Sequence, residues 1–468
     1  MRTFVKGLWK KSVSMRRAAI LCVVRAPATV ALLMLMCLVL RPSPAQAVPA
    51  FAAQTGQPCQ MCHVGGLGPQ LTPFGRAFKV HGYTMRTTSW NVPLAAMVQA
   101  SYTSTQKAAP QPVAPHYAPN DNFTIDQISL FFAGGFGPHF GAFIQTTYDG
   151  VARAFNWDQL DARATTTVDV KGNDVVLGTS VNNSPTVQDP WNTLPSWGFP
   201  YTTSSLAPAP TTAPLLNGAL AQTSLGATAY AWIDSALYLE AGGYESPGAT
   251  TLTRLGVDPT SPGSINGVAP YVRAAYQKTI GGATLEAGVF GLQSSIFPGL
   301  DRTTGFTDHY TDLGVDGSLY KALANSDVIT VNARYLHERQ SLDATCILDG
   351  ATDFGCARNH LTDMRADVAY YWRNRIGATV QVFDTTGSPN PVIYAANRTL
   401  KPDSSGVMFQ LDGTPFGGLS QPQRRVNVRM GLQYTLYTKF NGAGTNFDGA
   451  GTKASDNNTF RVFTWFAF

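Results

Sequence analysis

Charged residues are scarce in this sequence of 468 residues, because Asp, Glu, Lys and Arg together make up only 13% of it. Glycine, proline and aromatic residues are abundant instead, with 44 Gly, 30 Pro and 11% aromatics. This composition is unlike that of a helical enzyme and is typical of a β protein with many turns. No catalytic nucleophile, catalytic dyad or phosphate-binding loop is evident in the sequence, so nothing in it indicates bond-making chemistry.

Acidic residues are absent from positions 1–47, which hold eight of the 34 Lys and Arg residues. This stretch contains an apolar run at 28–40 and ends in the small-x-small pattern Ala45-Gln46-Ala47. We predict a signal peptide over 1–47, since a transmembrane helix needs about 20 apolar residues and this run is shorter. The remaining chain has 26 basic and 29 acidic residues and a net charge of −3. A basic surface for nucleic acid is therefore not supported, and we expect no such partner.

Cysteine is also rare, with six residues in all and four after the leader. Cys59, Cys62 and His63 form a C-x-x-C-H sequence, which is the attachment signature of a c-type haem. The two thiols would form thioethers to the haem, and the adjacent imidazole would be an axial ligand of its iron. A zinc half-site or a redox pair needs a second ligand pair or a βαβ context, and neither is visible. We predict one covalent haem c.

The other two cysteines of the exported chain are Cys346 and Cys356, ten residues apart. Disulfides are common in exported proteins, so this pair is most simply a loop disulfide.

A short helix is predicted after the haem motif, because Thr72 can cap it, Pro73 suits its first turn and Gly82 suits its end. Apolar residues at helical spacing predict one face toward the porphyrin: Phe74, Ala77, Phe78 and His81. His81 is on that face, and Met85 lies just beyond it. Either is a candidate second axial ligand, and a third possibility is that neither binds iron. A methionine ligand would raise the potential relative to two histidines.

From residue 92 onward apolar and polar residues alternate. The clearest stretches are 426–437, 364–373 and 329–335, and several run ten residues or more. Soluble sandwiches also alternate, but about 9–11 residues is the length that a tilted strand needs to cross a bilayer. We count about sixteen such segments. This predicts an all-β transmembrane barrel of about 16 antiparallel strands with a small N-terminal haem-binding helical unit.

Connections between these segments alternate in length. Short links are predicted at 134–138, 171–173, 234–235, 281–282 and 373–375, and long loops at 106–121, 184–222, 246–268, 294–307, 339–361 and 386–404. Outer-membrane barrels have short periplasmic turns and long outer loops, so this asymmetry favours a barrel. The segments 413–423 and the short link near Gly150 fit this pattern less well. The last strand ends the chain on Phe468, as an apolar closing strand in lipid would.

The residues around the haem motif carry a resemblance to a known family. They are Pro49-Ala50-Phe51-Ala52, Thr55-Gly56, Cys59 to His63, Pro69, Leu71, Phe74-Gly75, Phe78-Lys79 and Gly82-Tyr83. This pattern resembles the outer-membrane fused monohaem cytochrome c–porin family of iron-oxidising bacteria. The segment 64–68 is glycine-rich and longer than in typical members, which puts iron as the donor in doubt. The resemblance implies domains at 48–88 for the cytochrome unit and 89–468 for the barrel.

The resemblance implies an electron conduit of the bacterial outer membrane, with the haem unit at the periplasmic side or in the lumen. Its partners would be the membrane lipid, an extracellular donor such as ferrous iron, and a periplasmic carrier such as a small cytochrome. Any enzymatic activity would be that of an oxidoreductase. One alternative is a diffusion porin with a structural or sensory haem, and another is a soluble periplasmic β protein.

Two further sets of residues are weaker candidates. Inward-facing side chains that could pair with haem propionates are Arg334, Arg365, Arg373, Arg429 and Gln433, although lining a wet pore explains each of them equally well. Four histidines raise the question of a metal site, but solvated loop positions explain them better: His116, His309, His337 and His360.

Overall fold

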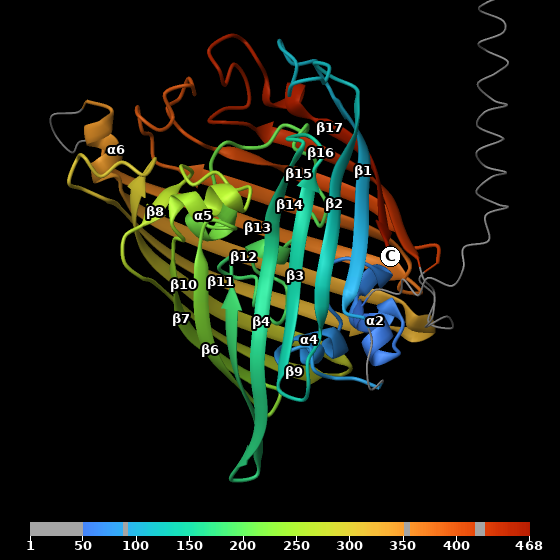
Figure 1. Ribbon diagram of the computed structural model, residues 1–468. Helices are drawn as coiled ribbons and strands as arrows, with labels where there is room; N and C mark the ends of the chain where they lie inside the picture. Colours follow the sequence, from blue (N-terminus) through green and yellow to red (C-terminus); the bar gives the residue numbers. More distant parts are fainter. Residues whose placement is uncertain (1–49, 88–91, 351–355, 417–425) are drawn as a thin grey trace, which may run out of the picture. The chain divides into compact units, whose positions relative to one another are not determined.

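Figure 1 shows the computed structural model, which describes residues 50–87, 92–350, 356–416 and 426–468. These residues all belong to one compact unit that spans 47–468. The predicted signal peptide at 1–47 lies outside the described residues. None of the helices in the described ranges is both long enough and apolar enough to cross a bilayer.

The described residues form seventeen antiparallel strands in one sheet. Their bounds are β1 Leu94–Thr105, β2 Asn122–Gly135, β3 Phe140–Asp149, β4 Ala154–Val170, β5 Asn173–Asn182, β6 Leu225–Ile233, β7 Leu237–Glu245, β8 Gly263–Ile265, β9 Ala269–Ile280, β10 Ala283–Pro298, β11 Asp308–Ala322, β12 Val328–Ser341, β13 Arg358–Trp372, β14 Ile376–Gly387, β15 Ser404–Gly413, β16 Asn427–Lys439 and β17 Thr459–Ala467.

The sheet closes on itself. β1 pairs with both β2 and β17, and β7 pairs directly with β9, so the ring contains every strand except the three-residue β8, which adds to β10. At the seam between first and last strand, Ala96 and Phe468 exchange two backbone hydrogen bonds of 2.8 and 3.1 Å. The predicted barrel of sixteen antiparallel strands is confirmed among the described residues.

Apolar side chains face outward and polar ones face the lumen. In β13, Met364 and Val368 are 46% and 53% exposed, whereas Asp363 and Asp367 are at most 5% exposed. The same alternation holds in β16, where Met430 and Leu432 are exposed and Arg429 and Gln433 on the other face are buried. A water-soluble sandwich buries the apolar face, so this exposed apolar surface excludes that fold and is the surface of a barrel in lipid. The alternative of a soluble periplasmic β protein is therefore wrong.

The links between strands follow the predicted alternation of short and long. Long connections at 106–121, 183–224, 246–268 and 388–403 leave one end of the barrel, together with the loop that contains α6 (Asp343–Leu348). The link at 150–153 also lies at this end and is unusually short. The loop predicted from residue 294 instead begins after Pro298, because β10 continues five residues further. Part of the predicted segment 413–423 lies outside the described residues.

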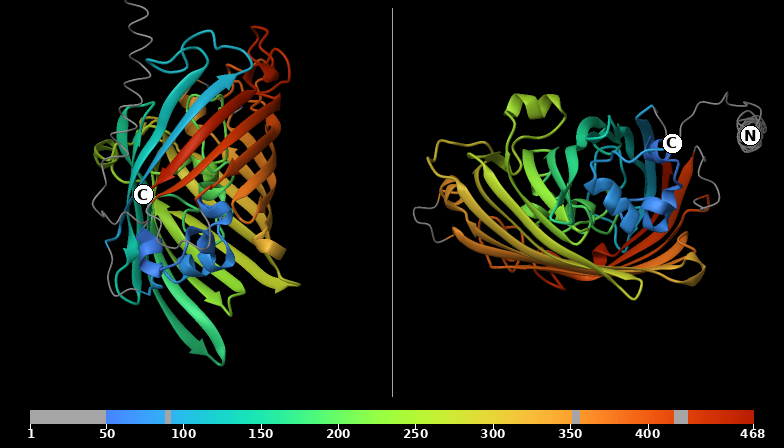
Figure 2. Two further views of the ribbon diagram at one scale, coloured as in Figure 1. Left: turned by 90° about the vertical axis from the view of Figure 1, so that its right-hand side faces the viewer. Right: turned by 90° about the horizontal axis from the view of Figure 1, so that it is seen from below.

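The lumen is filled by two segments. The N-terminal unit carries α2 (Ala50–Thr55), α3 (Cys59–Cys62), the short helix Val64–Gly66 and α4 (Pro73–Val80), and the ring of strands surrounds it in Figure 2. The second segment is the connection 183–224 between β5 and β6, which folds inward and buries Trp191, Leu194 and Leu216. We call it the lumen loop. The sequence predicted a long outer loop at 184–222, but this segment folds into the lumen and contacts the barrel wall.

Candidate functional site

The haem motif forms a single tight turn. Cys59 and Cys62 are the first and last residues of α3, and the backbone N–H of His63 donates to the carbonyl of Cys59 at 2.9 Å. Both thiols are free, and both line the same cavity as the imidazole of His63. One turn therefore presents two thiols and one imidazole to one space, which is the arrangement that a c-type haem requires.

Helix α4 packs directly on this turn. The hydroxyl of Thr72 accepts a hydrogen bond from the backbone N–H of Gly75 at 3.2 Å, so the predicted N-cap and the helix start at Pro73 are confirmed. A Cβ on Gly75 would lie 2.3 Å from the carbonyl oxygen of Cys62. Only glycine allows this approach, which sets the distance between the haem motif and the helix.

The cavity has a volume of about 400 Å³, within the range of small-molecule and cofactor sites. The N-terminal unit, strands β1–β4, the lumen loop and the end of β17 all contribute to its wall. Its lining includes many aromatic rings: Phe51, Phe78, Tyr83, Phe131, Phe143, Trp197, Tyr201, Trp465 and Phe468. A large, aromatic-lined cavity next to two free thiols fits a porphyrin.

The side of α4 that faces the cavity differs from the predicted stripe. Gly75, Phe78 and Lys79 line the cavity, whereas Ala77 packs against a cluster that contains Trp191 of the lumen loop and Trp232 of β6. The prediction that one apolar face of the helix, including Ala77 and His81, points to the haem site was therefore wrong. The helix is enclosed on nearly all sides, because it lies inside the barrel instead of on a surface.

Protonation of the motif is set by burial. Burial raises the pKa of both thiols, that of Cys62 to about 12, and lowers the pKa of His63 to about 4. A redox C-x-x-C pair needs a lowered thiol pKa, so these values argue against that alternative. A neutral imidazole is the form that binds metal. Its Nδ1 atom is buried and has no hydrogen-bond partner among the described residues.

Neither sequence-predicted second ligand lines the cavity. The Nδ1 of His81 lies 2.7 Å from the carbonyl oxygen of Ala77, and its ring packs against Trp232 at 6.0 Å between centroids. Met85 is fixed through its carbonyl oxygen, which accepts a hydrogen bond from Gln54 at 2.8 Å.

The structure instead brings a different thioether to the cavity. Met97 lies on β1, is 6% exposed and lines the cavity together with His63. Among the described cavity residues it is the only methionine, and His63 is the only histidine. The sequence showed Met97 only as an apolar residue in a strand, so no local signal could have revealed it.

The glycine-rich segment 64–68 attaches the N-terminal unit to the barrel wall near the ends of β13 and β16. The backbone N–H of Gly65 donates to the side chain of Asn374 at 2.6 Å, and the side chain of Asn427 donates to the carbonyl of Gly66 at 2.7 Å. Gly65 has φ of 71°, and a Cβ there would lie 2.7 Å from the ring of Tyr371. The glycine-rich segment 64–68 thus docks the N-terminal unit on the barrel.

The candidates for haem propionates are already paired. Ion pairs join Arg334 and Arg365 to Asp363, and Arg429 to Asp412. The amide of Gln433 donates to Gln410 at 3.0 Å. Arg373 lies in the exposed turn after β13 and stacks on Trp372, so its prediction as a lumen residue was wrong.

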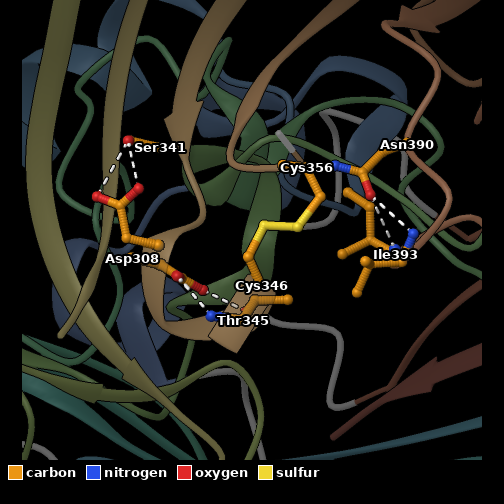
Figure 3. The surroundings of a disulfide bond; sticks show 9 residues. Asp308, Ser341, Thr345, Cys346, Cys356, Asn390 and Ile393 are labelled. Atoms are coloured by element: carbon orange, nitrogen blue, oxygen red, sulfur yellow. Dashed lines mark hydrogen bonds between the residues drawn. A yellow bond between two sulfur atoms is a disulfide. The ribbon is translucent and has the colours of Figure 1, made fainter. Parts of the chain in front are cut away.

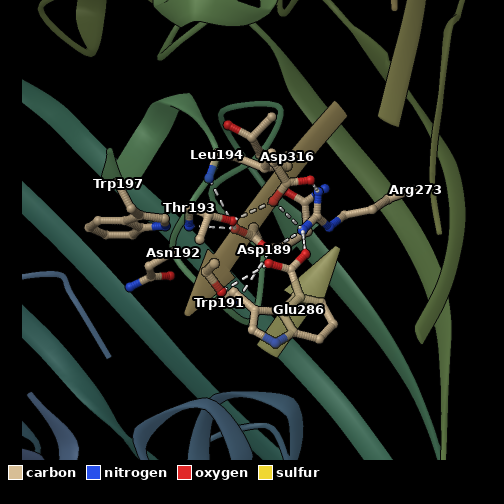
Figure 4. Close-up of polar contacts among 12 residues, drawn as sticks. Asp189, Trp191, Asn192, Thr193, Leu194, Trp197, Arg273, Glu286 and Asp316 are labelled. Atoms are coloured by element: carbon tan, nitrogen blue, oxygen red, sulfur yellow. Dashed lines mark hydrogen bonds and ion pairs between the residues drawn. The ribbon is translucent and has the colours of Figure 1, made fainter. Parts of the chain in front are cut away.

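The lumen loop is held by a buried charge cluster, shown in Figure 4. Arg273 on β9 lies 3.3 Å from Asp189 of the loop and from Glu286 of β10, and 2.9 Å from Asp316 of β11. Lys79 of α4 donates to three acceptors of this loop at 2.7 Å each: the carbonyls of Val187 and Asp189 and the side chain of Asn192. The loop therefore joins the N-terminal unit to the wall.

The loop also reaches the opposite wall. The side chain of Gln381 on β14 donates to the carbonyl of Phe199, and Arg461 on β17 donates to that of Thr202, both at 2.9 Å. Contacts on β9, β14 and β17 mean that the loop crosses the lumen from one side to the other.

At the loop-bearing end, Cys346 of α6 and Cys356 form a disulfide, with Cα atoms 5.9 Å apart (Figure 3). Nearby, the backbone N–H of Thr345 donates to Asp308 of β11 at 3.0 Å, and the amide of Asn390 donates to the carbonyl of Cys356 at 2.8 Å. The bridge thus secures an outer loop and is remote from the haem motif in sequence.

In the described part of the chain no three His, Cys, Asp or Glu side chains are grouped as a metal site. His116 lies in the exposed loop before β2. His309, His337 and His360 do not lie in loops, as the sequence suggested, but on strands β11, β12 and β13.

Comparison with known proteins gives distant fold likenesses. No family profile and no curated protein matches the chain. Among solved structures, the anion-selective porin from Comamonas acidovorans shows 12% identity and a TM-score of 0.43 over 80% of this chain and 98% of that one. The outer-membrane channel DcaP of Acinetobacter baumannii gives 11% and 0.43 over 80% and 96%, and OmpT of Vibrio cholerae 9% and 0.40 over the same shares.

The ring of strands, the outward apolar surface and the asymmetric links define the architecture without reference to these likenesses. Closure leaves no unpaired strand edge in lipid, which is a requirement for a spanning sheet. This chain is a 16-strand antiparallel, porin-like β-barrel of the bacterial outer-membrane type with short N-terminal helices.

Proposed function

We propose that this barrel holds one c-type haem in its lumen and passes electrons between an extracellular donor and a periplasmic carrier. The observation that carries the proposal is the aromatic-lined cavity into which Cys59, Cys62 and His63 all face. One-electron transfer is the chemistry that a c-type haem supplies when bound.

Each residue of the C-x-x-C-H motif would have its own role in holding the haem. The thiols of Cys59 and Cys62 would form the thioether links, and the neutral imidazole of His63 would bind the iron. Met97 is the candidate for a second iron ligand, because it lines the same cavity as His63. His81 and Met85 are the sequence-based alternatives. The aromatic lining would limit the access of water to a bound haem, and this, like a methionine ligand, would raise its potential.

Two segments inside the ring support electron transfer over solute flow. The N-terminal unit lies inside the ring, and the lumen loop contacts β9, β14 and β17 across it. Both segments take up room that a solute path would need, whereas electron transfer through a bound haem needs no such path.

Haem attachment is tested first. The exported protein is purified from cells that can mature c-type cytochromes, denatured and stained for covalently retained haem. We expect one haem per chain in the wild type and in Cys346→Ser/Cys356→Ser, and none in Cys59→Ala/Cys62→Ala. A wild-type chain without covalent haem contradicts the proposal.

Electron transfer is tested in anaerobic proteoliposomes that contain a soluble cytochrome inside. Ferrous iron or another impermeant donor is added outside, and the reduced haem α-band of each cytochrome is followed. We expect reduction inside only when the barrel carries its haem. Reduction by dithionite but by no impermeant donor would mean that the haem does not conduct across the membrane.

The axial ligand is tested by substitution at Met97. We expect Met97→Ala to change the ferric spectrum from low to high spin and to allow binding of added imidazole, and Met97→His to lower the midpoint potential while it stays low spin. His81→Ala and Met85→Ala are matched controls, which should keep the wild-type spectrum. A high-spin spectrum in either control would assign the ligand to that residue.

A second candidate function is a diffusion channel with a structural or sensory haem. The observation that favours it is the polar lumen wall, with residues such as Gln99, Ser129 and Thr147 facing inward as in water-filled porins. This candidate predicts steady ion conductance in planar bilayers and no electron transfer. The conduit predicts little conductance, so the two measurements separate the candidates.

A further inference from the structure

Five basic or titratable side chains gather on the outward surface of three neighbouring strands. They are His309 on β11, His337 and Arg339 on β12, and Arg358 and His360 on β13. All except the half-buried His337 are exposed. Three of the seven histidines of the chain are among them. We call these five residues the basic patch.

Strand register shows that the patch is contiguous. Arg339 pairs directly with His360, and Ser341 on β12 pairs with both His309 and Arg358. The rings of His337 and His360 are 6.0 Å apart. Since directly paired residues on one face have Cβ atoms about 5 Å apart, the five side chains form one cluster about three strands wide.

The patch lies at the edge of the lipid-facing band. Beyond the half-buried Thr311 and Thr362, the outward residues toward the short-turn end are apolar and exposed, and include Leu313, Val315, Tyr335 and Met364. In the other direction the strands lead into the long loops and α6, visible in Figure 1. Long loops mark the outer side of such barrels, so the patch is at the level of the outer-leaflet head groups.

Among the described residues, no carboxylate forms an ion pair with the arginines of the patch. Each of the six strand arginines that point into the lumen has a carboxylate partner: Arg163, Arg273, Arg334, Arg365, Arg429 and Arg461. Arg339 and Arg358 form no ion pair within the described ranges. The nearest carboxylates by register are Asp343, which accepts from Ser341 at the upper edge, and Asp384, paired with Met364 below.

We propose that the basic patch binds the phosphate groups of lipopolysaccharide in the outer leaflet. Guanidinium groups recognise phosphate oxygens through paired hydrogen bonds, and two arginines flanked by imidazoles suit a lipid head group with two phosphates. The apolar residues beneath contact the acyl chains of the same lipid. A metal ion is not the ligand, since no group of three metal-ligating side chains exists among the described residues.

Lipid retention by the purified holoprotein tests the proposal. The barrel is exchanged into detergent with added bisphosphorylated lipid A, and bound lipid is counted by native mass spectrometry. We expect Arg339→Gln/Arg358→Gln to lower lipid A affinity about 30-fold, from the effect of two surface arginines at an anionic membrane. Arg153→Gln/Arg254→Gln, which removes two exposed arginines elsewhere, is the matched control and should bind as the wild type does.

Two further binding experiments test the identity of the ligand and the role of the histidines separately. Dephosphorylated lipid A should bind the wild type as weakly as the patch variant does, and an equal concentration of inorganic phosphate should not displace lipid A. Affinity should rise on acidification from pH 8 to pH 5, where imidazoles gain charge, and this rise should vanish when all three patch histidines are changed to Gln.

Equal retention by wild type and patch variant, with both folded as shown by heat-dependent gel mobility, would overturn the proposal. Equal binding of dephosphorylated lipid, or full displacement by inorganic phosphate, would also overturn it. None of these outcomes depends on the haem.

Discussion

Arg273 is the main ionic fastening of the lumen loop to the barrel wall. Its guanidinium lies among the carboxylates of Asp189, Glu286 and Asp316, and its side chain is fully buried. Replacement of Arg273 by Met keeps much of the volume and removes the cation that forms ion pairs with all three acids. The acids then retain only the weaker attraction of Lys79 and Arg76, so the docking of the loop that carries Asp189 should weaken.

The cost can be worked from the partners that remain. Removal of one member of a buried ion pair costs about 3–5 kcal/mol. Asp189 retains N–H donors from Thr193 and Leu194 at 2.9 and 3.1 Å, and Glu286 retains the hydroxyl of Ser318 at 3.0 Å. Because these donors remain, we expect a cost at the low end of this range, about 3 kcal/mol. This cost corresponds to about a 150-fold rise in the ratio of released to docked loop.

Limited proteolysis measures this ratio. Chymotrypsin cleaves after aromatic residues, and Trp191 and Phe199 of the lumen loop are 2% and 3% exposed in the docked state. When opening is fast relative to cleavage, the cleavage rate follows the population of the open form. We expect cleavage within 183–224 about 100-fold faster in Arg273→Met, with the barrel still folded by heat-dependent gel mobility.

The control is Arg254→Met, because Arg254 lies exposed in α5 (Ala249–Arg254) and forms no ion pair in the described part of the chain. Its cleavage rate should match the wild type. An Arg273→Met barrel that resists chymotrypsin as the wild type does would refute the reasoning, since the loop would then be held by its apolar contacts alone.

Three further outcomes follow from the described contacts. Gly75→Ala places a Cβ 2.3 Å from a backbone carbonyl oxygen, so the free energy of unfolding should fall by about 1–3 kcal/mol, and the yield of bound haem should fall too. Gly248 has open space around it, so Gly248→Ala should change neither quantity. Burial alone would raise the pKa of Asp189, but attraction to its basic neighbours outweighs burial and lowers this pKa. The charge of Asp189 therefore stabilises the docked loop fully above the ordinary pKa of about 3.9, and this stabilisation is lost as the pH falls below that value. Pepsin cleavage within 183–224 should rise between about pH 4 and pH 2, and unchanged cleavage would contradict this. Cys346→Ser/Cys356→Ser should destabilise the outer loop by about 3 kcal/mol, seen as faster proteolysis at 342–357 with the barrel intact.

The sequence predicted the barrel well because alternation is a local signal. Stretches such as 364–373 and 426–437 show the two faces directly, and the short turns follow from their Gly and Asn residues. The helix at α4 was also predictable, since Thr72 and Pro73 define its start without reference to the rest of the chain.

Long-range placement could not be predicted in the same way. An inward fold of the lumen loop depends on partners such as Arg273 and Gln381, which are more than 80 residues away in the sequence. The orientation of α4 failed for the same reason, because a helix inside a barrel is buried on several faces. Met97 reached the cavity through the seam between β1 and β17, a contact that no local pattern encodes.

The seam has a consequence for biogenesis. The cavity is lined by the first folded segment of the chain, by β1, and by the final residues Trp465, Ala467 and Phe468. Met97 pairs with Ala467 across the closure itself. The pocket is therefore completed only when β17 has joined β1. A substitution that weakens this strand pairing would disturb the closure of the barrel and the wall of the pocket together.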